Sequence, residues 1–196
     1  GGGGGARAGG TSGEQADVAS GMAFTIERVA GSALRPETRA ALLAVCEAAY
    51  GEPMRPYLED VGPGEHLLGL EDGVPVSHLM WVTRRLEPEG MAPLRTAYVE
   101  LVATAPDARD RGYATRLLAS LPGLLEDYDL AALSPATERL YTRLGWRYWR
   151  GPLSIRTDTG LVPTPDEQIM YLPLPSTPPI DDTQPLSAEW RPGEVW

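Results

Sequence analysis

The order of apolar and polar residues predicts a β-sheet with helices packed against it. Alternating apolar positions indicate strands, and the Ala- and Leu-rich stretch opened by Pro36 predicts a helix over 36–50 with one buried face. A loop with a short helix is expected over 51–65, and Glu71-Asp72-Gly73 is typical of a tight hairpin turn. The strands expected in this half are 23–29, 66–70, 74–84 and 94–104.

The second half mixes short apolar runs with two stretches of helical periodicity. Helices are expected over 109–127 and 135–144. Short strands are expected at 128–133, 148–149, 153–156 and 169–172. From Pro173 the chain is Pro-rich and acidic, which predicts an irregular tail over 173–196. One strand–helix–strand unit over 96–133 favours an α/β (α+β) fold, a single domain with a central mixed β-sheet flanked by helices.

The glycine content separates the first residues from the rest. Nine of the 22 glycines lie in residues 1–21, a low-complexity stretch that cannot bury a core. We expect 1–21 to be a flexible leader and 22–196 to be the folded domain, with Met22 as the natural start.

The charged residues favour a cationic small molecule as partner, the alternative being that the acidic charge serves solubility alone. The chain carries 17 basic and 27 acidic residues, a net charge of −10, and every basic residue is Arg. Such a surface repels nucleic acid and anionic membranes, so neither is expected as a partner. No apolar run approaches the ~20 residues of a membrane span, and no signal-peptide pattern is visible. We therefore expect a soluble, cytoplasmic protein.

Cysteine and histidine are too few to indicate a disulfide framework or a metal site. The single cysteine, Cys46, falls inside the helix predicted over 36–50 and is expected in the core. The two histidines, His66 and His78, lie within predicted strands, where half-buried structural positions are expected. No metal is expected, because a zinc site needs more such ligands.

The most informative segment is an apolar strand that runs into a turn and then a helix. Val99 to Thr104 is followed by Arg109-x-x-Gly112-x-Ala114. Gly and Ala lack bulk, so a ligand can approach the backbone, and the unpaired N–H groups at a helix start attract anions. A pyrophosphate fits such a site. Taken alone, the motif is equally typical of a helix start with a packing glycine.

This segment resembles motif A of the GNAT superfamily of N-acetyltransferases, whose strand–turn–helix holds the pyrophosphate of acetyl-CoA. The segment from Ala132 to Trp146, with Tyr141 on its helix, looks like motif B of that superfamily. Other segments resemble the aminoglycoside 2'-N-acetyltransferase family: Tyr98-Val99-Glu100, Ala132-Leu133-Ser134, Trp149-Arg150-Gly151-Pro152, Val162-Pro163-Thr164-Pro165-Asp166-Glu167 and Glu189-Trp190-Arg191-Pro192-Gly193-Glu194-Val195-Trp196. The resemblance covers about 23–196 and implies a GNAT-type domain. Leu101 departs from the family by adding bulk.

The resemblance implies where acetyl-CoA binds. Backbone groups of Val102 and Thr104 would hold the pantetheine arm, and a backbone N–H near Leu101 or Val102 would bind the developing oxyanion. The remaining cofactor-binding residues belong to the turn and the helix start: Arg109, Arg111, Gly112, Tyr113, Ala114 and Thr115.

Two residues carry the implied catalysis. An amine is protonated at pH 7 and must lose a proton before attack, so Glu100 is assigned as the base, directly or through water. An ionised Glu on an apolar strand needs partners unless it faces outward, which is the alternative reading. Tyr141 is assigned as the acid for the departing sulfur, the alternative being a tyrosine packed on the sheet.

The resemblance also implies an acceptor site rich in carboxylates. Its residues are Glu100, Ser134, Asp166, Glu167, Glu194 and the carboxylate of Trp196. Charge placement agrees: 138–156 has a net charge of +4, whereas 52–72 and 166–196 each have −5. The expected function is acetylation of an aminoglycoside, at the 2'-amine, by an enzyme linked to antibiotic resistance and active as a homodimer. The alternatives are another small amine as acceptor, or a non-catalytic acyl-CoA-binding module.

Overall fold

The computed structural model describes residues 23–196, so the leader predicted over 1–21 and the start at Met22 lie outside the described part. Its strands are β1 Phe24–Ala30, β2 Glu65–Glu71, β3 Val74–Pro88, β4 Leu94–Thr104, β5 Leu130–Leu133, β6 Arg147–Tyr148, β7 Leu153–Thr157, β8 Gly160–Pro163, β9 Met170–Pro173 and β10 Leu186–Glu189. Its α-helices are α1 Pro36–Tyr50, α2 Arg55–Val61, α3 Tyr113–Ser120 and α4 Glu138–Thr142. Short 3-10 helices occupy Gly31–Ala33, Pro106–Ala108 and Pro122–Leu124.

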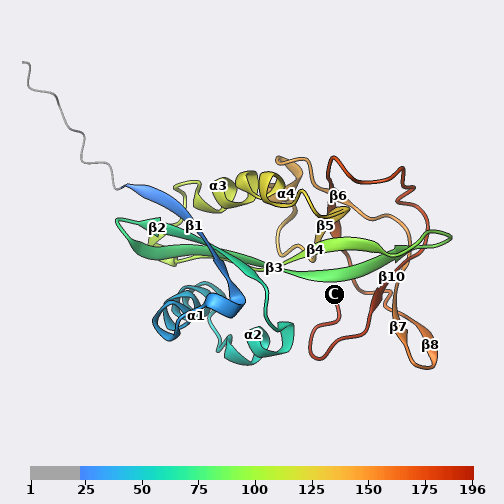
Figure 1. The fold of residues 1–196 in the computed structure, drawn as a ribbon, viewed down its shortest axis with the longest axis horizontal. Coiled ribbons are helices and arrows are strands. Elements are labelled where there is room, and N and C mark those ends of the chain that lie inside the picture. Colours follow the sequence, from blue (N-terminus) through green and yellow to red (C-terminus); the bar gives the residue numbers. More distant parts are fainter. Residues whose placement is uncertain (1–22) are drawn as a thin grey trace, which may run out of the picture.

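The strands form one mixed, twisted sheet whose centre is the long pair β3 and β4 (Figure 1). The order runs β6-β9-β5-β4-β3-β10-β7-β8, and β1 and β2 extend the sheet from the first half of β3. The edge of β3 that does not face β4 is thus shared between two strands. β2 pairs with it up to Trp81, and β10 pairs with it at Glu87 and Pro88. Among the strands of residues 23–196, only β4 with β5 and β7 with β10 run parallel.

Helices cover both faces of the sheet, and each face has its own apolar core. In Figure 1, α1 and α2 lie below the sheet, and α3 and α4 lie above it. Along β4 the side chains alternate, so that Tyr98 packs with the α1 side and Val99 with the α3 side. Cys46 is fully buried in the first core, as predicted.

The first half of the chain follows its predicted pattern closely. Pro36 opens α1, and Gly51 ends it in the left-handed conformation. Each strand from β1 to β4 is found where alternation indicates one, with β3 running four residues beyond its predicted end at Arg84. The prediction for the two histidines is wrong. They were expected to be half-buried, but both are almost completely buried.

Two predicted helices are too long. The helix expected over 109–127 begins only at Tyr113, because Asp110 and Gly112 have positive φ (64° and 74°), which a right-handed helix excludes. It ends before the Pro122 turn. The helix expected over 135–144 is reduced to α4, because Thr137 is still extended.

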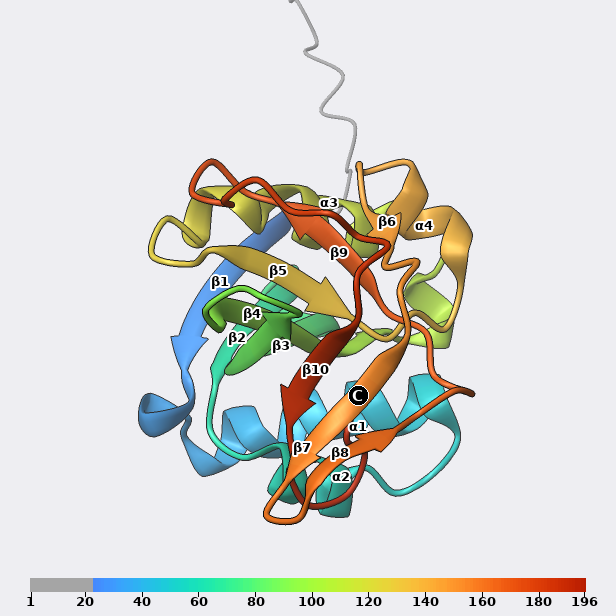
Figure 2. The ribbon, with the colours of Figure 1, turned by 90° about the vertical axis from the view of Figure 1, so that its right-hand side faces the viewer.

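The tail is also more ordered than its composition predicts. The stretch 173–196, expected to be irregular, contains β10, which pairs with β3 and β7. Viewed from its right-hand end, the molecule shows β10 beside β7, with the C-terminus over the α1 and α2 side (Figure 2). This return brings the last residues of the chain against the middle of β4.

Candidate active site

Strand β4 breaks its regular pairing at one point. His78 of β3 pairs with Ala103 and Met80 with Glu100, so Leu79 alone faces the two residues Leu101 and Val102. The extra residue is a β-bulge. Leu101 adopts a positive φ of 51°, a conformation that L-residues with bulky side chains rarely take. The bulge separates Glu100 on one side from Val102 on the other.

Strands β4 and β5 diverge beside this bulge. They pair only through Thr96, Ala97 and Tyr98, which leaves the β5-facing backbone of β4 beyond Tyr98 without a strand partner in β5. A cavity of about 230 Å³ opens there, which we call the β4–β5 cleft. Its lining comes from α1, β4, the turn before α3, and α4: Ala49, Tyr50, Val102, Ala103, Thr104, Arg109, Ala114, Ala136, Thr137, Leu140 and Tyr141.

The cleft suits a narrow ligand arm that ends in an anion. Its β4 wall offers backbone groups, and the first turn of α3 has no side-chain cap, so the N–H groups at the helix start remain available. Gly112 at this start has open space where a Cβ would stand and holds φ at 74°. Arg109 adds a positive charge beside it and donates to the carbonyl of Ala49 (3.3 Å).

The structure divides the residues expected to bind the cofactor. Val102, Thr104, Arg109 and Ala114 line the cleft together. Arg111 instead pairs with Glu71 (2.6 Å), and the hydroxyl of Tyr113 donates to the same carboxylate while its ring stacks on Phe24. Gly112 and Thr115 are outside the lining set of the cleft.

Tyr141 and Tyr50 place two hydroxyls at the cleft. Tyr141, on α4, has its ring packed against Trp146, and burial raises the pKa of its hydroxyl to about 12. The hydroxyl is therefore protonated at neutral pH and able to donate. Tyr50, at the end of α1, donates to the carbonyl of Val102 (2.9 Å), a backbone group that the resemblance assigned to the cofactor.

Glu100 lies on the opposite side of the bulge and is almost fully buried, with 6% of its side chain exposed. Its two carboxylate oxygens have separate partners. The Tyr57 hydroxyl donates to Oε2 (2.6 Å), and Nη2 of Arg191 donates to Oε1 (2.5 Å). Burial, followed by the charge of Glu100, raises the pKa of Tyr57, which keeps this hydroxyl a donor. The outward-facing alternative for Glu100 is thus not what the structure shows.

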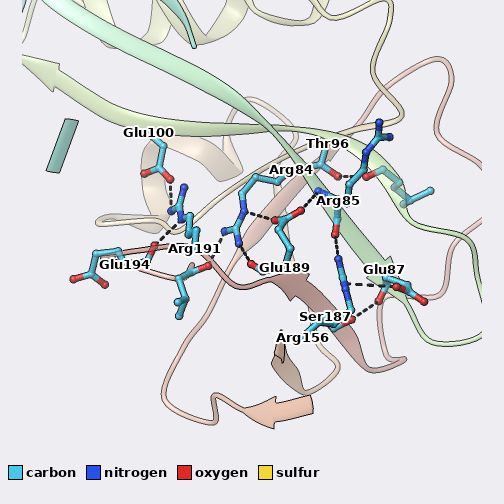
Figure 3. A network of polar contacts seen from close by, with 12 residues as sticks. Arg84, Arg85, Glu87, Thr96, Glu100, Arg156, Ser187, Glu189, Arg191 and Glu194 are labelled. Carbon is cyan, nitrogen blue, oxygen red and sulfur yellow. Dashed lines mark hydrogen bonds and ion pairs between the residues drawn. The ribbon is translucent and has the colours of Figure 1, made fainter. Parts of the chain in front are cut away.

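Arg191, which binds Glu100, belongs to a network of polar contacts that anchors the C-terminal tail (Figure 3). Arg84 of β3, 3% exposed, donates to the Glu189 carboxylate (2.6 Å), the Glu189 carbonyl (2.5 Å) and the Val195 carbonyl (2.6 Å). Arg191 also donates to the carbonyl of Glu194 (2.6 Å), and its guanidinium lies over the Tyr98 ring. We call Arg84, Glu189, Arg191 and Val195 the tail network.

A close contact fixes the end of the tail against α2. Gly193 has a positive φ of 73°, and a Cβ there would stand 2.6 Å from a carboxylate oxygen of Asp60. The next residues turn inward, so the Trp196 ring is buried, and its indole N–H donates to the Thr164 hydroxyl (2.9 Å). The terminal residue therefore lies beside the segment that carries the predicted Asp166 and Glu167.

The other residues predicted for the acceptor are less closely held. Ser134 and Asp166 are exposed, and Glu194 is exposed next to Arg191. Glu167 lies near enough to Tyr98 to contribute to raising the pKa of its hydroxyl, mainly a result of burial. None of these four residues has a hydrogen bond or ion pair to Glu100 among the contacts of residues 23–196.

Sequence reasoning missed the residues that hold Glu100. Tyr57 sits in a segment that reads as a broken loop, and Arg191 and Arg84 look like ordinary surface cations. Their common signal is indirect: an ionised Glu on an apolar strand requires buried donors. It does not say which of the 17 arginines supplies one.

A larger cavity, about 630 Å³, lies elsewhere. It opens where the edge of β3 is left between β2 and β10, and Trp81, Arg84 and Arg191 are in its lining. Volume alone does not make it the reaction site, because Glu100 and Tyr141 are absent from that lining. Within 23–196, no three His, Cys, Asp or Glu gather as a metal would require, and no helix is long and apolar enough to span a membrane.

Several solved structures share this fold. A putative N-acetyltransferase from Lactobacillus plantarum matches with a TM-score of 0.53 and 21% identity, over 78% of this chain and 99% of that one. Escherichia coli ElaA matches with a TM-score of 0.55 and 14% identity, over 76% and 99%. Eis1 from Mycobacterium abscessus matches with a TM-score of 0.54 and 19% identity over 63% of this chain, which spans only 31% of that longer protein.

Sequence comparisons lead to the same group. A family model for the acetyltransferase (GNAT) domain matches residues 33–149, which include β4, the β4–β5 cleft and α4. A curated protein of Mycolicibacterium fortuitum, named aminoglycoside 2'-N-acetyltransferase, is 36% identical over 189 residues, covering 92% of this chain and 96% of that protein. The protein described here therefore belongs to the GNAT acetyltransferase family and is an acyltransferase that uses acetyl-CoA.

Proposed function

We propose that this enzyme acetylates an amino group of an aminoglycoside, and that the 2'-amine is the group acetylated. The observation that carries the proposal is Glu100, a buried carboxylate held beside the bulge of β4 and bordered by an acidic tail. The 36% identity to an aminoglycoside 2'-N-acetyltransferase over nearly the whole chain supports the choice of acceptor.

The β4–β5 cleft fits acetyl-CoA, which supplies the acetyl group as a reactive thioester. Backbone groups of Val102 and Thr104 along the β4 wall bind an extended amide-containing arm in the manner of a missing strand. The uncapped start of α3 and Arg109 bind the pyrophosphate at the far end. Tyr141 then lies at the end of the cleft on α4, where its hydroxyl can donate a proton to the departing sulfur.

Glu100 removes the proton that the acceptor amine carries at neutral pH. Arg191 holds one oxygen of this carboxylate and Tyr57 the other, so its orientation is set before the acceptor arrives. The proton reaches Glu100 directly or through one water. A backbone N–H next to the bulge stabilises the negative charge that develops on the thioester oxygen.

The residues around Glu100 provide a surface for a polycation. Asp166, Glu167 and Glu194 contribute negative charge to this surface. Ser134, the residue after β5, adds an exposed hydroxyl. An aminoglycoside carries several ammonium groups, and dispersed carboxylates match them through charge-assisted hydrogen bonds.

The test is a CoA-release assay with matched aminoglycosides that carry either an amino or a hydroxyl group at the 2' position. Turnover is expected only with the 2'-amino compounds, and mass spectrometry of the product should place one acetyl group at that nitrogen. Equal turnover with both sets would overturn the regiochemistry, and turnover with simple polyamines alone would overturn the aminoglycoside.

We further propose that the enzyme acts in the cytoplasm as a homodimer and protects its host from aminoglycosides. Expression of the wild-type chain in a sensitive bacterium is expected to raise the inhibitory concentration of a 2'-amino aminoglycoside, whereas Glu100→Gln leaves it unchanged. Sedimentation of the purified protein tests the dimer.

A further inference from the structure

Two histidines are buried directly beneath the bulge of β4. His66 comes from β2 and is 2% exposed, and His78 comes from β3 and is 0% exposed. Their rings are linked by a bond of 2.9 Å between Nδ1 of His66 and Nε2 of His78. Neither residue has a part in the proton transfers described above, although buried imidazoles are costly unless they are hydrogen-bonded.

The direction of these bonds follows from chemistry. Nδ1 of His78 lies 2.8 Å from the carbonyl oxygen of Leu101, which can only accept, so Nδ1 carries the proton. The same nitrogen lies 3.6 Å from Sγ of Cys46, a weak second acceptor. Burial lowers the pKa of His66 to about 4 and that of His78 to about 3, so both rings are neutral at pH 7. Nε2 of His78 therefore accepts the proton of His66.

The hydrogen bonds that run from His66 through His78 end at the peptide unit between Leu101 and Val102. The carbonyl of Leu101 and the N–H of Val102 belong to the same peptide, which is trans and planar, so they point in opposite directions. Because His78 belongs to β3, its bond holds this carbonyl toward β3, and the N–H of Val102 is turned toward the opposite, β5-facing edge of β4, where the cleft lies. Val102 lines the β4–β5 cleft, and the Tyr50 hydroxyl reaches its carbonyl from there.

The bulge needs such a restraint because Leu101 is not glycine. A positive φ of 51° at a branched residue is strained, and the extended alternative would rotate this peptide. Rotation would move the Val102 N–H out of the cleft and also shift Glu100, which directly precedes Leu101. The bond from His78 opposes that rotation.

We infer that His78 is a positioning residue for acetyl transfer: by binding the Leu101 carbonyl, it aims the Val102 N–H at the thioester oxygen, and His66 orients His78. The inference rests on the acetyl-CoA chemistry of the family and on the Val102 N–H as the oxyanion donor. It is independent of which amine accepts the acetyl group.

Two substitutions at the same position separate this role from plain structural support. In His78→Asn, the amide nitrogen can occupy the place of Nδ1 and still donate to Leu101, but the bond to His66 is lost. In His78→Gln, the amide oxygen can occupy the place of Nε2 and still accept from His66, but the bond to Leu101 is lost. Each variant loses one buried hydrogen bond, so similar losses of thermal stability are expected.

The decisive readout is the infrared stretching frequency of the thioester carbonyl in bound, carbonyl-labelled acetyl-CoA. A hydrogen bond to the oxygen lowers this frequency, and the measurement needs no acceptor. We expect the lowered frequency in the wild type and in His78→Asn, and a return toward the value of free acetyl-CoA in His78→Gln. In the same way, kcat should fall about tenfold or more in His78→Gln and stay within about threefold in His78→Asn.

A matched control and a second variant complete the test. Thr96→Val removes a buried hydroxyl that donates to the Leu94 carbonyl at the other end of β4, and it should lower stability without changing the frequency. If His78→Gln does not fold, His66→Leu, which leaves the bond to Leu101 in place, should give a partial shift in the same direction.

The inference is overturned if His78→Gln keeps the wild-type frequency, or if both His78 variants lose kcat in proportion to their stability. If the frequency behaves as expected while no aminoglycoside is acetylated, the proposed acceptor fails and the role of His78 stands.

Discussion

The two sides of the β4 bulge are built in different ways. The β4–β5 cleft is made of backbone groups, small residues and a helix start, nearly all from 102–141 and close together in sequence. The acceptor side is made of charged side chains that are far apart in sequence, since the partners Glu100 and Arg191 are 91 positions apart. A cleft that binds a constant cosubstrate through main-chain atoms tolerates sequence change. A side that recognises one kind of acceptor depends on particular side chains and on the tail that carries them.

The largest expected effect is on the acceptor side, in Glu100→Gln. This change keeps the size of the side chain and removes the base, so kcat should fall by about 10²- to 10⁴-fold. The affinity for CoA should stay unchanged, because Glu100 is not part of the cleft lining. Stopped-flow turnover together with CoA calorimetry checks both halves of this statement. A variant that loses CoA binding along with turnover would contradict the separation of the two sides.

The next effect concerns the tail network. Arg84→Met removes three charge-assisted bonds to Glu189 and Val195, so we expect the free energy of unfolding to fall by about 3 kcal/mol. The KM for the acceptor should rise while the dissociation constant for CoA stays the same.

The control for Arg84→Met is Arg150→Met. Arg150 also pairs with a carboxylate, that of Asp182, but its side chain is 68% exposed, and the loss should be below about 1 kcal/mol. If urea unfolding gave equal losses in the free energy of unfolding for the two variants, the burial of Arg84 would have no special importance.

Low pH should destabilise both sides of the β4 bulge together, because His66 and His78 lie beneath it. Their pKa values in the folded protein, about 4 and about 3, are below the value of about 6.5 for an unfolded chain. The unfolded chain therefore binds more protons, and stability falls as the pH falls from about 6.5 toward 4, by about 3 kcal/mol for each histidine.

Urea unfolding between pH 7 and pH 4 measures this loss. His66→Leu should be less stable at pH 7 and show a flatter pH dependence than the wild type. An identical slope in the two proteins would assign the acid sensitivity to other groups.

The smallest effect is expected within the cleft. Tyr141→Phe removes the proton donor for the sulfur and leaves the ring packed on Trp146. We expect kcat to fall by about tenfold to a hundredfold, with the melting temperature and the CoA affinity almost unchanged. Turnover equal to that of the wild type would leave Tyr141 a packing residue only.

The same contrast explains what the sequence could predict. The α1 helix, the first four strands and the turn at Gly112 depend on neighbouring residues, and their patterns are visible in the chain. Strand β10 is four residues, Leu-Ser-Ala-Glu, in a Pro-rich stretch, and it exists because β3 and β7 pair with it. Helix α3 starts late because Asp110 takes a left-handed conformation, which no periodicity reveals.

The residues of the candidate site also fall into those that local patterns predict and those that depend on distant parts of the chain. Glu100, Tyr141 and four residues of the cleft lining, Val102, Thr104, Arg109 and Ala114, belong to local motifs and were predicted. The bonds of Tyr57 and Arg191 to Glu100 were not predicted, because they depend on how α2 packs near β4 and how the tail returns to it. Arg84 is the clearest case: only the structure shows that a cation in a strand anchors the last residues of the chain.

The most direct test is a crystal structure of the enzyme with CoA and a 2'-amino aminoglycoside bound. We expect the CoA sulfur next to Tyr141 in the β4–β5 cleft and the 2'-nitrogen within hydrogen-bond reach of Glu100, directly or through one water. CoA bound outside that cleft, or an aminoglycoside seated in the 630 Å³ cavity with its 2'-nitrogen out of reach of Glu100, would contradict the account.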